Sequence, residues 1–566
     1  MTEPKRLTPN ETAKEKSLYL RGTIAEELAK DTTHFGKDDN ILLKSHGTYE
    51  QDDRDIRQKL LAEKKEPAYG MMARLRTTGG KLTPDQYIQF DEIADKFGNH
   101  TLRATTRQTF QFYSIKKVNL KAFMQAVHKA QSTTQGACGD NVRNVLLCPA
   151  PFHNREKYGL LDYAKKVSTH FLAKGGAYEE IWLDGERIPG IETKNPEEAE
   201  PIYGKTFLPR KFKIAFAFPD DNCVDVYSND LGIVPEIKND AIVGFTILAG
   251  GGFGTTHGVK TTYPRLATPL CFVKPEDLVK IAEAVVLTQR DFGNREDRKT
   301  ARLKYTIDRM GFEKFREEVE KRFGKKTEDP HPLKWDSIYN HLGWHEEGGG
   351  KWFFGLAIEN GRIKDQGDFK MKSGLRAFVE KYRPGIYVTA QQDILFSGFT
   401  ENQKQEAEAF LTSYGIPLPV KVSNVRKDSM ACVALPTCGL AIAEAERVFP
   451  DVIGELEKHI QALGLSGQRI MARMTGCPNG CARPYNAEIS FIGRSVGTYN
   501  VYVGGSLIGD RLNTLYAEKI PLAELGNKIL PLFKLYKKER TSLHEGFGDY
   551  CHRVGIPYLQ QASLTV

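Results

Sequence analysis

The 566-residue sequence contains no apolar run that approaches the roughly 18–20 residues needed to cross a membrane. Its first residues, MTEPKRLTPNETAKEKS, are polar and have no apolar core of the signal-peptide kind. The net charge is +8, but the basic residues are dispersed and form no block that would grip DNA or an anionic membrane. These absences predict a cytoplasmic protein that binds neither nucleic acid nor membrane.

The odd number of cysteines, nine, argues against a disulfide framework in such a chain. Four of them form two close pairs, and we expect the other five to be buried as small hydrophobic residues: Cys138, Cys148, Cys223, Cys271 and Cys551. A dinucleotide site is not predicted, because the glycine run GGGFG at 250–254 lacks the full G-x-G-x-x-G pattern. No flavin module is evident either.

The composition is that of an ordinary globular protein, 40% hydrophobic and 27% charged, and the length predicts two to four domains. We expect a helix at 19–29 and an irregular segment at 45–57. The region 71–130 then predicts the order β-α-β-β-α, beginning with a strand at 71–78. Its first helix should begin at Thr83-Pro84 and end at Gly98.

The same order of elements is predicted again between residues 351 and 414. Aligning TLRATTRQTFQFYSI (101–115) with GIYVTAQQDILFSGF (385–399) matches Gln108 to Gln392. An apolar segment, a strand and a glycine-rich turn follow in both parts of the chain. We therefore predict an α+β protein of two related halves, with a central ferredoxin-like-repeat domain and two related α/β domains in a pseudo-twofold arrangement.

The predicted domain boundaries follow from this repeat. They are an N-terminal extension (1–65), the central ferredoxin-like-repeat domain (66–135 plus 346–420), a first α/β domain (136–345) and a second α/β domain (421–566). Where the first half has Arg103 and Arg107, the second has Tyr387 and Gln391, and only the second half has paired cysteines. One half is thus cationic and the other suited to metal, which suggests a shared site at the pseudo-twofold axis.

The paired cysteines have the spacing Cys432-x5-Cys438 and Cys477-x3-Cys481, with 38 residues between the pairs. Thiolates suit zinc or iron–sulfur clusters, but structural zinc sites favour shorter gaps than the first pair offers. A 4Fe–4S cluster accepts wider spacings, and the Pro-Asn-Gly loop of the second pair supplies N–H groups for cluster sulfurs. The pattern favours a 4Fe–4S cluster over zinc or no metal.

These motifs resemble the sulfite/nitrite reductase family, which couples siroheme to a 4Fe–4S cluster, and the likeness covers nearly the whole chain. The segments that carry it, besides TGCPNGC, are YLRGTIAEEL (19–28), HGTYEQDDRDIR (46–57), RQTFQF (107–112), RNVL (143–146), LPRKFK (208–213) and GFGDY (546–550). The resemblance implies a pseudo-twofold sulfite/nitrite reductase fold. It places siroheme and substrate binding in 136–345, and cluster and siroheme binding in 421–566.

The resemblance also implies roles for individual residues. The four paired cysteines hold the cluster, and Cys481 bridges it to the siroheme iron. Asn479 lies in the short loop beside the cofactors. The substrate anion is bound by two arginines and two lysines, which fall on Arg74, Arg143, Lys211 and Lys213. Arg103 and Arg107 resemble partners of the siroheme carboxylates, and Arg76 and Arg483 are weaker candidates.

Strand parity gives independent but weak support for the cationic residues. In LPRKFKIAFAF, Phe212 and Ile214 would share one strand face and Lys211 and Lys213 the other. Arg74 and Arg76 would pair in the same way, and Arg103 would align with Arg107 if that strand ran without a bulge. Alternating basic residues more often form a solvated strand face, so parity alone would not identify a site.

The implied reaction is the six-electron reduction of sulfite to sulfide. A siroheme nitrite reductase is the nearest alternative; in that branch the position of Lys213 typically holds asparagine, whereas this sequence keeps lysine. A non-catalytic iron–sulfur electron carrier and a zinc-stabilised structural protein remain alternatives from other classes. Electrons must come from another protein, and the family offers two, an NADPH-dependent flavoprotein subunit and ferredoxin. We favour the flavoprotein.

Overall fold

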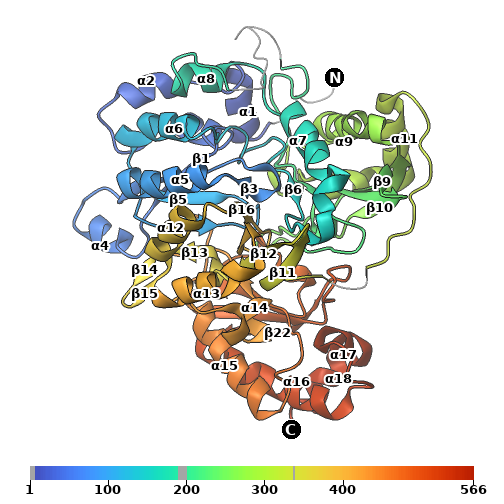
Figure 1. Ribbon diagram of the computed structural model, residues 1–566. Helices are drawn as coiled ribbons and strands as arrows, with labels where there is room; N and C mark the ends of the chain where they lie inside the picture. The colour runs from blue at the N-terminus through green and yellow to red at the C-terminus, as the bar shows by residue number, and fades with distance from the viewer. Residues whose placement is uncertain (1–6, 189–199, 336–337, 566) are drawn as a thin grey trace.

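The computed structural model describes residues 7–188, 200–335 and 338–565 (Figure 1). Its main framework is four five-stranded sheets. Two of them, the first and second central sheets, are antiparallel throughout and are interleaved. The other two, the first and second peripheral sheets, are mixed and lie toward the right and the bottom of the view. The architecture is therefore α+β, as predicted.

The central sheets exchange their edge strands. The first has the order β1-β2-β5-β4-β13 and the second the order β11-β12-β17-β16-β3, so each ends on a short strand from the other half of the chain. The strands are β1 (Thr48–Asp52), β2 (Tyr69–Arg74), β3 (Lys81–Leu82), β4 (Leu102–Ala104), β5 (Phe110–Ile115), β11 (Gly343–Gly348), β12 (Lys351–Leu356), β13 (Arg362–Ile363), β16 (Gly385–Val388) and β17 (Ile394–Phe399).

The peripheral sheets share one topology. In each, the first three strands in chain order are parallel neighbours, and the last two are added antiparallel. The first comprises β6 (Leu146–Leu147), β7 (Ile214–Phe216), β8 (Leu231–Lys238), β9 (Ala241–Ala249) and β10 (Thr268–Val273). The second comprises β18 (Met430–Ala431), β19 (Ala472–Thr475), β20 (Ile489–Ser495), β21 (Thr498–Val503) and β22 (Thr514–Pro521). The predicted duplication is confirmed in both pairs of sheets.

Helices cover the outer faces of the sheets (Figure 1). On the central sheets, α5 (Pro84–Phe97) packs against α6 (Leu120–Lys129) and α12 (Met371–Tyr382), and α12 packs against α13 (Lys404–Ser413). On the peripheral sheets, α9 (Leu278–Phe292) pairs with α11 (Phe312–Phe323), and α15 (Phe449–Ala462) with α16 (Leu525–Glu539). The remaining helices are α1 (Pro9–Lys16), α2 (Ile24–Ala29), α3 (Lys37–Leu42), α4 (Arg57–Ala62), α7 (Leu160–His170), α8 (Ala177–Trp182), α10 (Leu303–Met310), α14 (Asn424–Lys427), α17 (Phe547–Val554) and α18 (Ile556–Ala562), besides the small hairpin β14 (Asp365–Gln366) and β15 (Phe369–Lys370).

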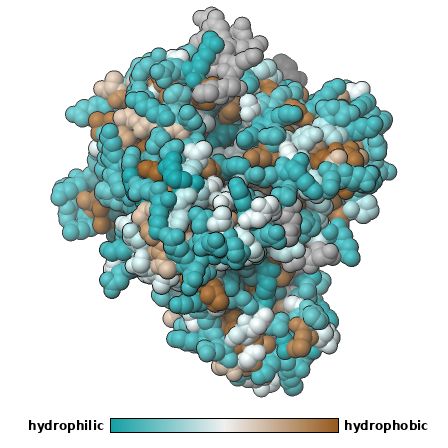
Figure 2. All heavy atoms as spheres, viewed as in Figure 1, coloured by the Kyte–Doolittle hydropathy of each residue, from teal (hydrophilic) through white to brown (hydrophobic). Residues whose placement is uncertain are grey.

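Two hydrophobic cores hold this arrangement. The larger is continuous through both central sheets and the first peripheral sheet, whereas the second peripheral unit has its own core beneath α15 and α16. On the face that Figure 2 shows, hydrophilic residues predominate and hydrophobic ones lie in small separate groups. In the ranges that the structure describes, no helix has the length and apolar content needed to cross a membrane.

Local sequence signals placed most elements well. Thr83 caps α5 through a capping box with Gln86, and Gly98 follows its last residue, as predicted. Two predictions near the N-terminus are wrong. The helix expected at 19–29 begins only at Ile24, because Tyr19 and Leu20 are left-handed. The segment 45–57 is not irregular, since it contains β1, whose backbone pairs with β2.

Where the two halves of the chain meet, a glycine and a glutamine from each half make equivalent contacts with backbone carbonyls. Gly80 and Gly361 both have φ of +74°, and a Cβ on either would lie 2.1 Å from a carbonyl oxygen, that of Val388 or Ala104. The aligned glutamine Gln108 donates its side-chain N–H to the same Val388 carbonyl at 3.2 Å. Gln392 does so to the Ala104 carbonyl at 3.5 Å. The exchanged strands thus approach too closely for any side chain at these glycines.

We predict that Gly361→Ala destabilises the protein by about 2–4 kcal/mol, because a left-handed φ and a carbonyl clash coincide there. Gly367→Ala is the matched control: Gly367 has φ of +59°, but a Cβ there would meet nothing within 4 Å. Thermal unfolding of both variants at one scan rate measures the difference. Equal melting temperatures would contradict the close-approach argument.

Candidate active site

The four paired cysteines gather at one edge of the second peripheral sheet. Cys432 directly follows β18, and Cys477 and Cys481 lie in the loop after β19. Since β18 and β19 are parallel neighbours, their carboxyl ends open at the same edge. Cys438 comes close through a turn in which its backbone N–H donates to the Ala434 carbonyl at 2.9 Å.

The electrostatic influence of these thiols on one another indicates that the four are neighbours. Burial raises the pKa of Cys432 well above its ordinary value. The sulfurs of Cys481, Cys477 and Cys438 raise this pKa further. Burial and then Cys481 raise the pKa of Cys438 and bring that of Cys477 to about 12. However, no three of these four sulfur atoms all lie within 4.8 Å of one another in the described residues. The spacing is wide for one ion and suits a larger cluster.

Donors surround the sulfurs, as a metal cluster requires. The Gly476 N–H donates to Cys432 Sγ at 3.4 Å, and the Asn479 side chain donates to Cys477 Sγ at 3.5 Å. The cysteine loop is also held from outside. Arg54 of the N-terminal segment donates to the Ala441 carbonyl at 2.6 Å and to the Cys438 carbonyl at 3.3 Å. Asn479 therefore lies beside the cysteines, where the sequence placed it.

The four cations predicted to bind substrate converge from the first half. Arg74 is the last residue of β2 and lies beside Gln111. With the Gln111 amide turned so that its oxygen faces Arg74, that oxygen accepts a hydrogen bond from Arg74 Nη2 at 2.6 Å. Arg143 donates to the Tyr49 hydroxyl at 3.3 Å and to the Gly139 carbonyl at 3.2 Å. Both side chains are thereby fixed by neutral groups. Neither of these contacts neutralises the guanidinium charge.

Lys211 and Lys213 lie near Arg143 and near Cys481. Burial lowers the pKa of both lysines well below the ordinary value; Arg210 and Arg143 add to the effect at Lys211, and Arg107 and Arg302 at Lys213. The Cys481 sulfur opposes the shift at both. Because one sulfur influences both ammonium groups, the cationic group and the cysteine group meet at Cys481.

The two lysines test whether siroheme and an anion fit here. Within the described ranges, neither ammonium group has a hydrogen-bond acceptor or an ion-pair partner. The two lysines are half-buried but strongly desolvated, and desolvated charges without partners are costly, so this part of the molecule calls for a bound anion. A tetrapyrrole with eight carboxylates together with sulfite would supply that charge, and the donor set of arginines and lysines suits both. The residues present therefore fit the implied groups.

Other predicted residues lie elsewhere than strand parity suggested. No single strand connects Arg103 to Arg107, because β4 ends at Ala104 and Gln108 has a left-handed backbone in the turn that follows. Arg103 points to the cysteine side, where it pairs with Glu446 at 2.7 Å. Arg107 points to the lysine side and donates to Asn229 Oδ1 at 2.7 Å. Their proposed contact with siroheme carboxylates stays a prediction.

The weaker candidates have structural partners. Arg76 lies beyond the end of β2, buried among backbone carbonyls, and donates to that of Val142 at 2.9 Å. The strand predicted to reach residue 78 ends at Arg74, so the two arginines do not share a strand face. Arg483 forms an ion pair with Asp225 at 2.5 Å. Asp225 and Arg483 occupy equivalent left-handed positions in the two halves, so this pair joins the halves across the pseudo-twofold axis.

Several residues that the sequence reasoning did not assign support the site. Tyr49 and Arg54 both lie in HGTYEQDDRDIR, and Arg210 lies in LPRKFK, so the motifs contained them without indicating what they contact. Arg302 pairs with Asp230 at 2.8 Å, and Asp230 also accepts the backbone N–H of Lys213. No spacing signal marked that buried pair, because its members are far apart in the sequence.

We predict that Cys438→Ser removes the iron–sulfur cluster, because an alcohol is a poor substitute for one of four thiolates. Iron and acid-labile sulfide per chain should fall by about the four irons and four sulfides of one cluster. Cys551→Ser is the control, since Cys551 is a buried cysteine of the same half but lies in α17, outside the quartet. Retention of full labile sulfide by Cys438→Ser would contradict the ligand assignment.

Comparison with known proteins identifies the family of this chain. A family model described as nitrite and sulphite reductase 4Fe-4S domain matches residues 162–327, and one described as nitrite/sulfite reductase ferredoxin-like half domain matches 63–130 and 345–414. The latter matches fall on the central sheets. The former falls on the first peripheral unit, whose topology the cysteine-bearing unit repeats.

Full-length relatives are also similar. The chain is 46% identical to a sulfite reductase [NADPH] hemoprotein beta-component of Geobacillus thermodenitrificans, over 96% of this chain and 95% of the relative. It is 43% identical to that of Staphylococcus haemolyticus, over 98% and 96%. The solved structure of Mycobacterium tuberculosis NirA has the same fold, with a TM-score of 0.79 at 23% identity over 98% of this chain and 97% of that one. With its four clustered thiols and the cations that face them, the chain belongs to the siroheme- and 4Fe–4S-containing sulfite reductase hemoproteins of the sulfite/nitrite reductase family.

Proposed function

We propose that this chain catalyses the six-electron reduction of sulfite to sulfide, SO₃²⁻ + 7 H⁺ + 6 e⁻ → HS⁻ + 3 H₂O, in sulfate assimilation. The observation that carries this proposal is the meeting of the Cys481 sulfur with two desolvated lysines, Lys211 and Lys213, that have no ion-pair partner among the described residues. When bound, siroheme and the cluster supply the iron that holds the substrate sulfur and the path for electrons. Cys432, Cys438, Cys477 and Cys481 are the residues we assign to the cluster.

The cations of this chain perform two tasks in that reaction. Arg74 and Arg143, which are fixed by Gln111 and Tyr49, are suited to hold the sulfite oxygens as preorganised donors. Lys211 and Lys213 have lowered pKa values, because burial and neighbouring cations disfavour their charged forms. A lysine with a lowered pKa releases its Nζ proton more readily, so these two are the proposed donors when oxygen leaves as water.

Sulfite is favoured over nitrite as substrate by the charge of the site. A second lysine at position 213 adds a cation that suits a dianion with three oxygens better than a monoanion with two. Direct comparison of kcat/KM for sulfite and nitrite tests this, on siroheme-loaded protein with a reduced viologen dye as donor. Ammonia from nitrite with negligible sulfide would move the proposal to the nitrite branch.

We predict that Lys213→Met lowers kcat/KM for sulfite by about 100- to 1000-fold, the usual loss for one preorganised transition-state donor. Siroheme absorption and iron content should be unchanged, because Lys213 is not a cluster ligand. Lys205→Met is the matched control, since Lys205 precedes the same segment but is exposed. Undiminished sulfite turnover by Lys213→Met would refute the role of this lysine.

The electron donor is proposed to be an NADPH-dependent flavoprotein subunit, with ferredoxin as the second candidate, acting in the cytoplasm. The names of the similar proteins, which are NADPH-dependent hemoprotein components, support the flavoprotein. All nine cysteines are free, as suits a reducing compartment. The cysteine loop reaches the surface at Gly439 and Leu440, next to Cys438, and the side chain of Leu440 is 66% exposed. We propose that the donor docks there.

We predict that Leu440→Glu lowers the rate with the protein donor at least tenfold, because a charge replaces an apolar contact beside the cluster. The rate with a small reduced dye should stay unchanged. Leu543→Glu is the matched control, because Leu543 is 68% exposed and lies outside the cysteine loop. An equal loss in both variants, or a loss with the dye as well, would contradict docking at this loop.

A further inference from the structure

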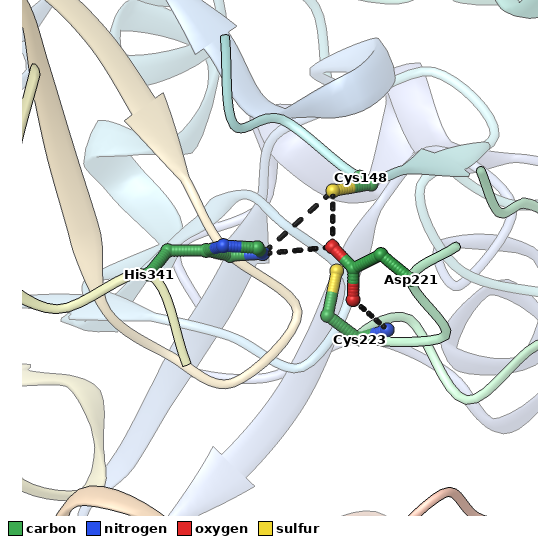
Figure 3. Close-up of side chains that lie close together, drawn as sticks. All are labelled: Cys148, Asp221, Cys223 and His341. Atoms are coloured by element: carbon green, nitrogen blue, oxygen red, sulfur yellow. Dashed lines mark hydrogen bonds and ion pairs between the residues drawn. The ribbon is translucent and has the colours of Figure 1, made fainter. Parts of the chain in front are cut away.

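A second group of potential metal ligands lies in the first half, apart from the cysteine quartet. Cys148, Asp221, Cys223 and His341 place one ligand atom each within 4.8 Å of all the others (Figure 3). Their side chains point toward a common centre from three separate segments. The sequence had suggested only that the two cysteines are buried small hydrophobic residues. Both cysteines are buried, but they lie next to the polar side chains of Asp221 and His341.

The separations within this group suit a single tetrahedral ion. Cys148 Sγ lies 3.1 Å from Asp221 Oδ2 and 3.7 Å from His341 Nε2, and those two atoms are 3.3 Å apart. Zinc–sulfur, zinc–nitrogen and zinc–oxygen bonds at a tetrahedral angle give edges of about 3.3–3.8 Å. The two longer separations fall in this range, and the shortest needs an adjustment of a few tenths of an ångström.

Burial and charge also favour a metal. None of the four residues is more than 3% exposed. Zinc with two thiolates, one carboxylate and one neutral imidazole would carry a net charge of −1. The Arg155 guanidinium lies 3.7 Å from both Cys148 Sγ and Asp221 Oδ2 and offsets part of that charge, although it also pairs with the exposed Asp220. Asp221 Oδ1 is held in turn by the backbone N–H groups of Cys223 at 3.0 Å and Tyr339 at 3.3 Å, as outer partners of a metal ligand are.

The repeat explains why two cysteines are in this place. Cys148 directly follows β6, as Cys432 directly follows β18 in the equivalent sheet. Cys223 lies eight residues before the first residue of β8, as Cys481 lies eight residues before the first residue of β20. The two cysteines thus occupy the positions of two cluster ligands, completed here by Asp221 and His341 at a spacing suited to one ion.

We propose that Cys148, Asp221, Cys223 and His341 form a structural zinc site in the first half of the chain. Mixed thiolate, imidazole and carboxylate ligands suit Zn²⁺, and four buried protein ligands leave no open position for catalysis. The site joins the end of β6, the loop between β7 and β8, and the segment that leads into β11. It fastens the first peripheral unit to the second central sheet.

The test is metal analysis of the full-length, siroheme-loaded protein expressed with zinc supplied. We expect about one zinc per chain in addition to iron, with zinc-edge X-ray absorption showing two sulfur and two nitrogen or oxygen ligands. This edge is blind to the iron centres. Cys223→Ala should lose the zinc while keeping labile sulfide and siroheme, and its melting temperature should no longer respond to a zinc chelator.

Cys271→Ala is the control, because Cys271 is also buried in the first half but lies in β10, outside the group. His341→Ala serves as the second loss variant if Cys223→Ala does not fold. Three results would each overturn the proposal: no zinc in the wild-type protein, equal zinc in wild type and Cys223→Ala, or a Cys148–Cys223 disulfide found by mass spectrometry. Loss of zinc with sulfite turnover retained would leave the proposed reaction untouched.

Discussion

The site depends on the opposition between buried positive charge from one half of the chain and sulfur ligands from the other. In the part of the chain that the structure describes, Lys211 and Lys213 have no anionic side chain paired with them, and the sulfur of Cys481 is a group of opposite sign whose influence reaches both. A folded chain tolerates such an excess of charge when a ligand supplies the missing anions. Affinity for a polyanionic cofactor and for a small oxyanion therefore has one physical origin.

The two halves of the chain exchange edge strands, and this exchange brings the cations of one half next to the cysteines of the other. Each central sheet is closed by a strand from the other half, through β3 and β13, and glycines allow the backbones to approach. The Asp225–Arg483 pair adds an electrostatic contact between equivalent positions. Because the halves cannot slide past each other without breaking these contacts, the cations and the cysteines keep a fixed relation. Divergence of the two copies then gave each a different chemistry.

Much of the fold and of the site was predictable from the sequence, because capping, periodicity and residue spacing depend on residues that are close together in the chain. The helix from Pro84 to Phe97, the repeat and the four cysteines followed from capping, periodicity and spacing. The strand exchange did not, since strands of two residues carry no pattern. Parity failed at Arg103 and Arg107 because a turn interrupts the strand between them. The group around His341 was missed because its members are distant in sequence and gather only through the fold.

The separate core of the second peripheral unit has an evolutionary consequence. The four cysteines proposed as cluster ligands lie in that unit, whereas Arg74, Arg143 and the two lysines lie next to residues of the other core. Substitutions at the cations proposed to bind substrate therefore leave the packing around the cysteines largely undisturbed. Selection on the anion that is bound and selection on the proposed redox centre can thus act on separate parts of the fold.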